Sequence, residues 1–196
     1  MENKREAILE ATMEVVAQKG LADFSVRQAA ERASVSEALI YKYFETKDGL
    51  LFACFESVHK QVAEAMSAMK MPASAGRDDL IAFVREMWLA YLDVLIRGGS
   101  RTLFYYAYCD SPFRERALSN ESEAASTYFK DFVVLFRELD QVLHIYEKTD
   151  HDTLWTYIID VTGIFARRMI KGQIQDTPQN RESAFRYVFA GLSWLG

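Results

Sequence analysis

The sequence predicts an all-α protein of about nine helices, with a small N-terminal helix-turn-helix domain and a larger helical domain. Apolar residues recur at helical spacing along most of the 196 residues, and no alternation typical of a strand persists. Only 9 glycines and 3 prolines are present, which favours long helices over many short strands. Half of the residues are apolar, enough for a sizeable core and too many for a largely disordered chain.

Cap residues mark the beginnings of the N-terminal helices. A capping box pairs a small polar residue with a glutamate or glutamine three positions later. Two pairs with this spacing predict a helix over 4–19 and another after residue 25: Asn3 with Glu6, and Ser25 with Gln28. Ser36 caps a third, short helix that ends near Phe44, and Thr46 caps a fourth.

Glycines, prolines and polar clusters divide the rest of the chain into further helices. Residues 71–76 are predicted to form a loop. The helices expected after it are one that stops at 98–99, one over 101–109, a helical stretch over 113–147 with a break near 119–120, and two more over 152–171 and 180–194.

Charge and cysteine usage exclude several classes of protein. The net charge is −5, and residues 1–47 hold 7 Lys or Arg against 8 Asp or Glu, so bulk charge does not indicate nucleic-acid binding. The longest apolar run, 103–109, is too short for a membrane span, and the charged first twenty residues do not resemble a signal peptide. Cys54 and Cys109 lie in apolar contexts, and no metal or catalytic motif is present. We therefore expect a cytoplasmic protein that is not an enzyme and has no cofactor, no metal and no contact with a membrane.

The segment up to residue 47 has the arrangement of a helix-turn-helix: two short helices joined by a three-residue turn, 33–35, with another helix packed across them. In the second short helix, Ile40 and Phe44 form an inner edge. Glu37, Ala38, Tyr41 and Lys42 point the other way, where such residues suit base edges and phosphates. Short α-hairpins in ordinary bundles have a similar pattern, so this signal is only moderately specific.

Four segments together resemble the N-terminal signature of TetR/AcrR-type transcriptional repressors. They are FSVRQAA at 24–30, VS at 35–36, IYKYF at 40–44 and TKDGL at 46–50. The resemblance covers residues 5–51, about a quarter of the chain. It implies a DNA-binding domain over 1–47 and a ligand-binding and dimerisation domain over 48–196.

The resemblance also implies a role for each matching position. Arg27 and Tyr41 match positions that reach bases or backbone, and Glu37, Ala38 and Lys42 occupy the variable reading positions. The positions expected to contact phosphates are Ser25, Ser36, Tyr43 and Lys47. Lys47 could instead be a solvated lysine, although a cation at a helix start is unfavourable.

Two residues depart from the family pattern. Ser34 stands where the family usually has glycine, so it must tolerate an unusual backbone or shift the turn slightly. Glu37 places a carboxylate on the reading face, where it could accept from cytosine N4 or repel phosphates.

A row of glutamates follows one side of the first helix at intervals of four residues: Glu2, Glu6, Glu10 and Glu14. We interpret this row as a solvent-facing side, although like charges at this spacing repel one another weakly. It must point away from the duplex, because it would otherwise oppose binding to DNA. Lys4 and Arg5 lie beside it and are candidates for contact with the DNA backbone.

Aromatic residues crowd the larger domain. Tyrosine and tryptophan have polar tips that need partners when buried, so these residues either form an ordinary core or line a pocket. The resemblance implies an inducer pocket for a small molecule, and we expect an aromatic or lipophilic one. Its candidate lining residues are Trp88, Tyr91, Tyr105, Tyr108, Phe129, Phe132, Trp155 and Ile159. His144 is a weaker candidate for the pocket, whereas Asp160 and the pair Asp93 and Arg97 indicate solvent-facing positions.

The last two helices have extensive apolar faces, and in the resembled family such helices pair with their copies. The residues expected at a dimer interface are Phe165, Met169, Phe185, Val188, Phe189 and Leu192. The sequence thus predicts a homodimeric, ligand-responsive transcriptional regulator, a repressor, that binds a palindromic operator in double-stranded DNA. The main alternative is an all-helical protein that binds an apolar ligand and has no DNA function. A helical enzyme is a weaker alternative, because no acid–base constellation is present.

Overall fold

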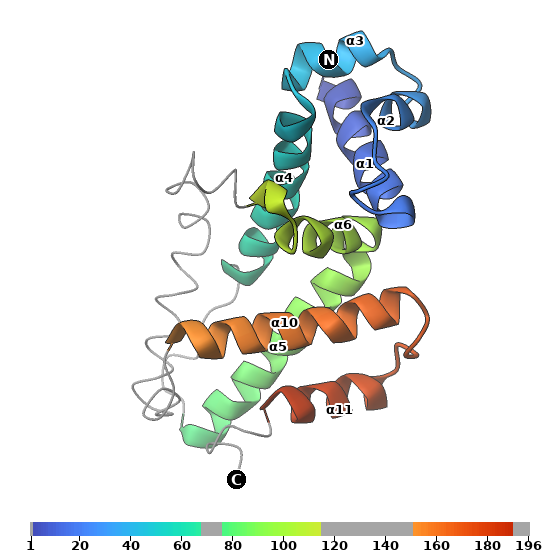
Figure 1. Ribbon diagram of the computed structural model, residues 1–196. Coiled ribbons are helices and arrows are strands. Elements are labelled where there is room, and N and C mark those ends of the chain that lie inside the picture. The colour runs from blue at the N-terminus through green and yellow to red at the C-terminus, as the bar shows by residue number, and fades with distance from the viewer. Residues whose placement is uncertain (1, 68–75, 115–150, 190–196) are drawn as a thin grey trace. The chain divides into compact units, whose positions relative to one another are not determined.

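The computed structural model describes residues 2–67, 76–114 and 151–189, and every regular element in these ranges is an α-helix (Figure 1). This confirms the all-α prediction. The helices are α1 (Glu2–Lys19), α2 (Val26–Arg32), α3 (Glu37–Phe44), α4 (Lys47–Ser67), α5 (Arg77–Gly98), α6 (Ser100–Cys109), α10 (His151–Ile170) and α11 (Pro178–Phe189). Nearly all of the predicted helical stretch 113–147 lies outside the described residues.

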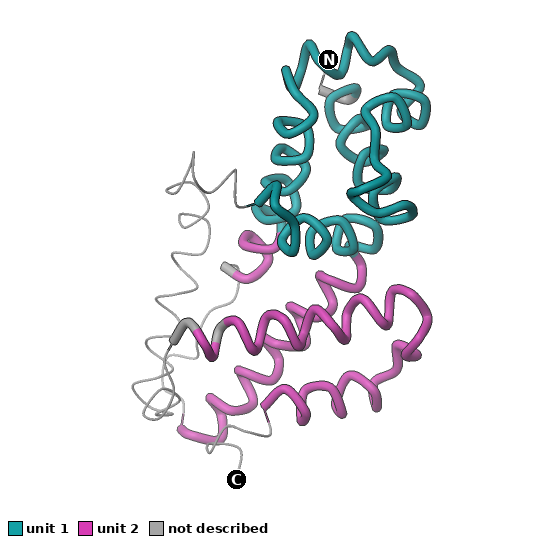
Figure 2. Tube along the Cα trace, viewed as in Figure 1, with its two compact units in different colours: residues 1–61, 98–127 teal, residues 62–97, 128–196 magenta. Residues whose placement is uncertain are grey.

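The chain divides into two compact units, drawn in teal and magenta in Figure 2. Unit 1 consists of residues 1–61 and 98–127, and unit 2 of residues 62–97 and 128–196. Helix α4 therefore contributes residues to both units, and the break between α5 and α6 coincides with a unit boundary. The domain boundary expected after residue 47 stays a prediction.

Side-chain caps begin both helices of the helix-turn-helix. The Ser25 hydroxyl accepts the backbone N–H of Gln28 at 3.4 Å, and the Gln28 side chain accepts the N–H of Ser25 at 3.0 Å, which is the predicted capping box. The Ser36 hydroxyl accepts the N–H of Leu39 at 3.2 Å. Because α2 and α3 have only 7 and 8 residues, these caps satisfy a large share of the backbone groups at their ends.

The turn between these helices contains a strained residue. Ser34 has a φ of +54°, in the left-handed region that favours glycine. The N–H of Val35 donates back to the carbonyl of Ala30 at 2.9 Å, which reverses the chain at this point. Ser34 therefore adopts the unusual backbone that the sequence predicted for a non-glycine residue here, at a cost of roughly 1–2 kcal/mol.

The inner face of α3 is buried, as predicted: Ile40 and Phe44 are 1% and 7% exposed. A Cβ at Gly49, in the first turn of α4, would overlap the carbonyl oxygen of Phe44, so glycine permits the close approach of α4 to the end of α3. Further along α4, the Cys54 thiol donates to the carbonyl of Leu9 in α1 at 3.7 Å. Burial raises the pKa of Cys54, which makes it the inert core thiol that its apolar context predicted.

Three glutamates of the row on α1 are partly exposed, as expected, but they also form ion pairs that their spacing did not indicate: the side chains of Glu6, Glu10 and Glu14 are 51%, 36% and 40% exposed. Arg101 of α6 pairs with Glu6 at 3.4 Å and also with Glu10, and Arg32 of α2 pairs with Glu14. These partners lie 18 to 95 residues away along the chain, so helical spacing alone could not reveal them. The row is a contact surface between α1 and its neighbours α2 and α6.

In unit 2, Trp88 links α5 to both C-terminal helices. Its indole N–H donates to the Thr162 hydroxyl of α10 at 2.9 Å, and that hydroxyl donates to the carbonyl of Ile158 at 2.6 Å. On the other side, the Trp88 ring lies 5.7 and 6.3 Å from the rings of Phe185 and Phe189 in α11, measured between centroids. Helices α5, α10 and α11 therefore share one core.

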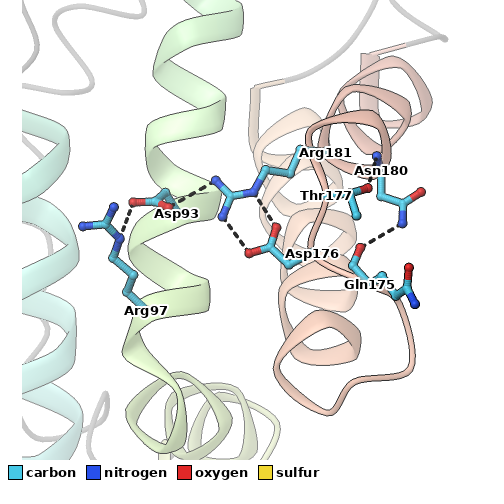
Figure 3. Close-up of polar contacts among 7 residues, drawn as sticks. All are labelled: Asp93, Arg97, Gln175, Asp176, Thr177, Asn180 and Arg181. Carbon is cyan, nitrogen blue, oxygen red and sulfur yellow. Dashed lines mark hydrogen bonds and ion pairs between the residues drawn. The ribbon is translucent and has the colours of Figure 1, made fainter.

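An ionic network fixes the beginning of α11 to α5 (Figure 3). The Arg181 guanidinium donates to both carboxylate oxygens of Asp176, at 2.5 and 2.8 Å, and to Asp93 of α5 at 3.1 Å. Asp93 also pairs with Arg97 at 2.7 Å, which confirms the predicted pair but makes it part of a larger network. The hydrogen bonds and charge of Arg181 lower the pKa of Asp176.

Replacing Ser34 with glycine should raise the free energy of unfolding by about 0.5–1 kcal/mol, because glycine adopts a positive φ without a Cβ clash although it loses more backbone entropy on folding. Denaturant unfolding followed by circular dichroism measures the change. The matched control is Ala33→Gly, at a neighbour with a φ of −79°, which should instead lower stability. A Ser34→Gly variant no more stable than the wild type would contradict the strain at this turn.

At neutral pH, Arg181→Ala should lower the free energy of unfolding by about 1 kcal/mol, a modest loss because its partners are partly exposed. The loss should shrink as the pH falls below 3.8, the ordinary pKa of Asp176. A carboxylate whose folded pKa is lowered stabilises the fold above its unfolded pKa, and this contribution disappears as the pH falls through the folded pKa.

Denaturant unfolding of both proteins across this pH range measures the effect. Arg97→Ala is the control, because Arg97 is 80% exposed and reaches the network only through Asp93, so its loss should stay within about 0.5 kcal/mol. An Arg181→Ala deficit that is equally large at acid pH would argue against an ionic origin.

Candidate nucleic-acid interface

One face of α3 is exposed along its length. Ile40 on the opposite face is buried. The residues on the exposed face are Glu37, Ala38, Tyr41 and Lys42. Glu37 occupies the first turn of α3, where the helix dipole favours a negative charge. The tyrosine hydroxyl, the lysine ammonium and the small alanine offer the hydrogen-bonding groups and the close approach that base edges and phosphates require.

Arg27 of α2 lies near two carboxylates. Its Nε donates to Glu31 Oε1, one helical turn later, at 2.8 Å, and the two side chains are 76% and 62% exposed. The hydrogen bond and charge of Glu31 raise the pKa of Arg27, and the charge of Glu37 in α3 raises it further. The guanidinium is therefore firmly charged and close enough to the first turn of α3 to interact with its carboxylate.

Lys47, the first residue of α4, is half-buried and bound within the protein. Its Nζ donates to the carbonyl oxygen of Phe24 at 2.7 Å and lies 5.3 Å from the centre of the Phe24 ring. Phe24 directly precedes Ser25, the cap of α2. Lys47 thus ties the beginning of α4 to the beginning of α2, a role that its position in the sequence did not indicate. Because an ammonium has three donors, contact with a phosphate stays a prediction.

The other residues expected to contact phosphates also have structural roles. The hydroxyl oxygens of Ser25 and Ser36 accept backbone N–H groups as caps, which leaves the hydroxyl hydrogen for another acceptor. Tyr43 is half-buried, with its ring centroid 6.0 Å from that of Phe44. The guanidinium carbon of Arg5 lies 5.3 Å from the centre of the same Phe44 ring. The contact of Arg5 with Phe44 joins α1 to α3.

A family profile described as "Bacterial regulatory proteins, tetR family" matches residues 8–54, which hold most of α1, all of α2 and α3, and the beginning of α4. The HTH-type transcriptional regulator BetI of Stenotrophomonas maltophilia is 33% identical over 82 residues, 41% of this chain and 42% of that regulator. The BetI protein of Paraburkholderia phytofirmans is 35% identical over 74 residues, 38% of each chain. The chain therefore aligns with less than half the length of these curated relatives.

The fold is similar over almost the whole chain to a solved structure. A TetR family transcription regulator from Marinobacter aquaeolei VT8 has a TM-score of 0.74 and 23% sequence identity, over 97% of this chain and 96% of that one. Residues 8–54 therefore match the N-terminal domain of the TetR family of bacterial regulatory proteins, and the chain as a whole has the fold of a solved TetR-family regulator. The matched segment contains the cap serines, the exposed face of α3 and the lysine at the start of α4.

The tyrosines predicted to line a ligand pocket in unit 1 have protein partners. The Tyr105 hydroxyl and His59 Nδ1 share a hydrogen bond at 3.1 Å, and the Tyr108 hydroxyl donates to the carbonyl of Phe113 at 3.5 Å. The Phe55 ring stacks on both tyrosines, at centroid distances of 5.4 and 5.0 Å. The sequence did not suggest His59 as a partner of Tyr105, because 46 residues separate them.

The remaining pocket candidates lie in unit 2 or outside the described residues. Trp88 is 3% exposed, and its N–H is satisfied by Thr162, so it belongs to the core. Tyr91 and Ile159 are half-buried. Three candidates lie outside the described residues: Phe129, Phe132 and His144. A fourth candidate, Trp155, belongs to α10, but its side chain lies outside what the structure describes. The ligand pocket stays a prediction.

Most of the residues predicted for a dimer interface are buried within unit 2, so a role for them in an interface stays a prediction. The side chains that are at most 6% exposed are Met169, Phe185, Val188 and Phe189. Helical spacing identifies an apolar face but not what covers it. Phe165 is half-buried, and Leu192 lies outside the described residues.

Other large apolar residues of α10 and α11 are exposed instead. Tyr157, Ile164 and Tyr187 are 41%, 44% and 67% exposed, and the Tyr157 hydroxyl donates to the carbonyl of Tyr187 at 3.3 Å. Asp160 on α10 is exposed too, as predicted. The helices α10 and α11 therefore present an apolar surface made of residues that the sequence did not indicate.

Within the described ranges, no helix is both long and apolar enough to cross a membrane. The same ranges contain no group of three or more His, Cys, Asp or Glu side chains that could hold a metal ion.

Proposed function

We propose that this chain is a transcriptional repressor that binds a two-fold symmetric operator in duplex DNA as a homodimer and releases it when a small molecule binds within residues 48–196. The observation that carries DNA binding is the exposed face of α3, opposite a fully buried inner face. The match to the family profile supports the assignment. The competing function is that of an all-helical protein for an apolar ligand, without contact to DNA.

Helix α3 has the dimensions and the support of a recognition helix. It has 8 residues, short enough to enter a major groove about 12 Å wide. Burial of Ile40 and Phe44 holds its axis in place, while Tyr41 and Lys42 remain exposed to bases and phosphates. One such helix reads only a few base pairs, so a symmetric pair about 34–36 Å apart would be needed for specific binding.

The wild-type protein should select duplexes that carry an inverted repeat from a random pool, and its affinity should fall steeply with salt. Because the chain carries a net charge of −5, a few local cations must supply this dependence. Lys47→Ala should weaken binding to all duplexes alike and reduce the salt slope by about one unit if Lys47 contacts a phosphate.

Lys171→Ala is the matched control, because Lys171 is exposed in unit 2, and it should leave the slope unchanged. If Lys47 acts only through its hydrogen bond to the Phe24 carbonyl, Lys47→Ala should lower the affinity for DNA and leave the salt slope unchanged. A wild-type protein without salt-dependent binding to duplex DNA would favour the competing function.

For the dimer, we propose the exposed apolar surface of α10 and α11 as the interface, with Tyr157, Ile164 and Tyr187 at its centre. Ile164→Asp should produce a folded monomer, because it places a charge in an apolar contact without touching the core of unit 2. Light scattering measures the mass, and circular dichroism checks the fold.

Ala90→Asp, at an exposed position of α5, is the control and should leave the dimer intact. Phe189→Asp should unfold the protein instead, because Phe189 is 3% exposed. An Ile164→Asp protein that keeps the wild-type mass would place the interface elsewhere.

For the inducer, we propose an aromatic or lipophilic small molecule. A compound that quenches tryptophan fluorescence should also lower operator affinity, and operator DNA should weaken the compound by the same factor, roughly 5–150-fold. Fluorescence titration of a panel of apolar compounds, with and without the selected duplex, measures both directions. A compound that binds tightly and leaves operator affinity unchanged is not the inducer.

A further inference from the structure

Arg27 uses only one edge of its guanidinium within the protein. Its Nε donates to Glu31 at 2.8 Å, and no other hydrogen bond from Arg27 is found among the described residues. A guanidinium is a rigid planar fork with five N–H donors, so the donors on its two terminal nitrogens remain available. These nitrogens form the edge that makes paired, parallel hydrogen bonds to a flat acceptor.

The charges around Arg27 favour a neutral acceptor over a phosphate. Glu31 is in contact with the guanidinium, and Glu37 at the start of α3 also interacts with it. Two carboxylates oppose the approach of a third anion, whereas directional hydrogen bonds to an uncharged acceptor are weakened much less. Guanine presents two such acceptors, N7 and O6, in the major groove, and an arginine fork matches both.

The backbone that carries Arg27 is held firmly. Its neighbours Val26, Ala29 and Ala30 in α2 are at most 5% exposed, and the capping box begins the helix directly before them. The conformational freedom that remains at this position belongs to the long side chain of Arg27. The hydrogen bond from Arg27 to Glu31 restricts this freedom. A side chain restrained before binding loses less entropy when it meets its acceptor.

We propose that Glu31 is a positioning residue that orients Arg27 for a bidentate contact with one guanine in each half-site, and that this pair determines specificity at that base pair. The proposal rests on the proposed function, because it concerns how the same surface reads DNA. A simple helical ion pair between Arg27 and Glu31, without a role in reading, is the competing outcome.

The test compares sequence selection from a random duplex pool by the full-length wild type and three variants. The wild type should enrich guanine at one position in each half-site. Arg27→Ala should lose the discrimination at that position, by about 5–150-fold, and keep the rest of the motif. Glu31→Ala should relax the same position and no other, because the guanidinium is no longer oriented.

Glu31→Gln separates orientation from charge. Its amide oxygen can still accept from Arg27 Nε, so the discrimination should return towards the wild-type value. Both Glu31 variants should bind non-specific duplex more tightly at low salt, because each removes a negative charge near the phosphates. A purely electrostatic role for Glu31 would not distinguish the two variants in selectivity.

Glu14→Ala is the matched control, since it removes the acceptor of Arg32, another exposed arginine of α2, and should leave the motif unchanged. Selection of an unchanged motif by Glu31→Ala, or relaxation of every position alike, would overturn the inference and leave DNA binding standing. A wild-type protein that enriches no sequence would overturn the proposed function, and the inference with it.

Discussion

The structure of unit 1 depends on one constraint: a helix of 8 residues does not hold itself together in water. Helix α3 is stable only because other elements complete it. Ser36 caps its first turn, Ile40 and Phe44 anchor its inner face, and the close approach at Gly49 fixes its end against α4. All of these supports lie on the inner side of α3 or at one of its ends, so none of them involves its outer face.

Local charge pairing, more than net charge, shapes this protein. The chain is acidic overall, yet three glutamates of α1 are paired with Arg101 and Arg32 from other helices: Glu6, Glu10 and Glu14. Arg27 remains charged while its carboxylate neighbours moderate its attraction for anions. A chain with a negative net charge can therefore present a surface suited to an anionic polymer. Salt screens distant charges, so the electrostatic potential at that surface depends mainly on the charged groups nearest to it.

Local signals in the sequence predicted much of the fold. The serines that cap α2 and α3 act over three residues, and the burial of Ile40 and Phe44 follows from helical spacing. The positive φ of Ser34 followed from a serine in a glycine position, once the family resemblance was recognised.

Interactions between segments that are far apart in the sequence could not be predicted from these local signals. The bond from Lys47 to the carbonyl of Phe24 involves a backbone atom, which no side-chain pattern reveals. The apolar faces of α10 and α11 were visible in the sequence, but Val188 and Ile164 look alike there although one is buried and the other exposed. Helical periodicity shows which side of a helix is apolar, but it does not show which segment packs against that side.

The pairing of Arg101 with α1 links the N-terminal helices to a segment made much later. Glu6 and Glu10 stand one turn apart and repel each other until Arg101, 95 residues beyond Glu6, lies between them, where it also donates to Gln61 at 2.9 Å. The N-terminal helices are synthesised before this arginine. A fragment cut at residue 61 would lack Arg101 and would keep the repulsion between Glu6 and Glu10, about 0.2–0.5 kcal/mol, so recombination that grafts these helices onto another protein would favour variants that also supply a cation at this place.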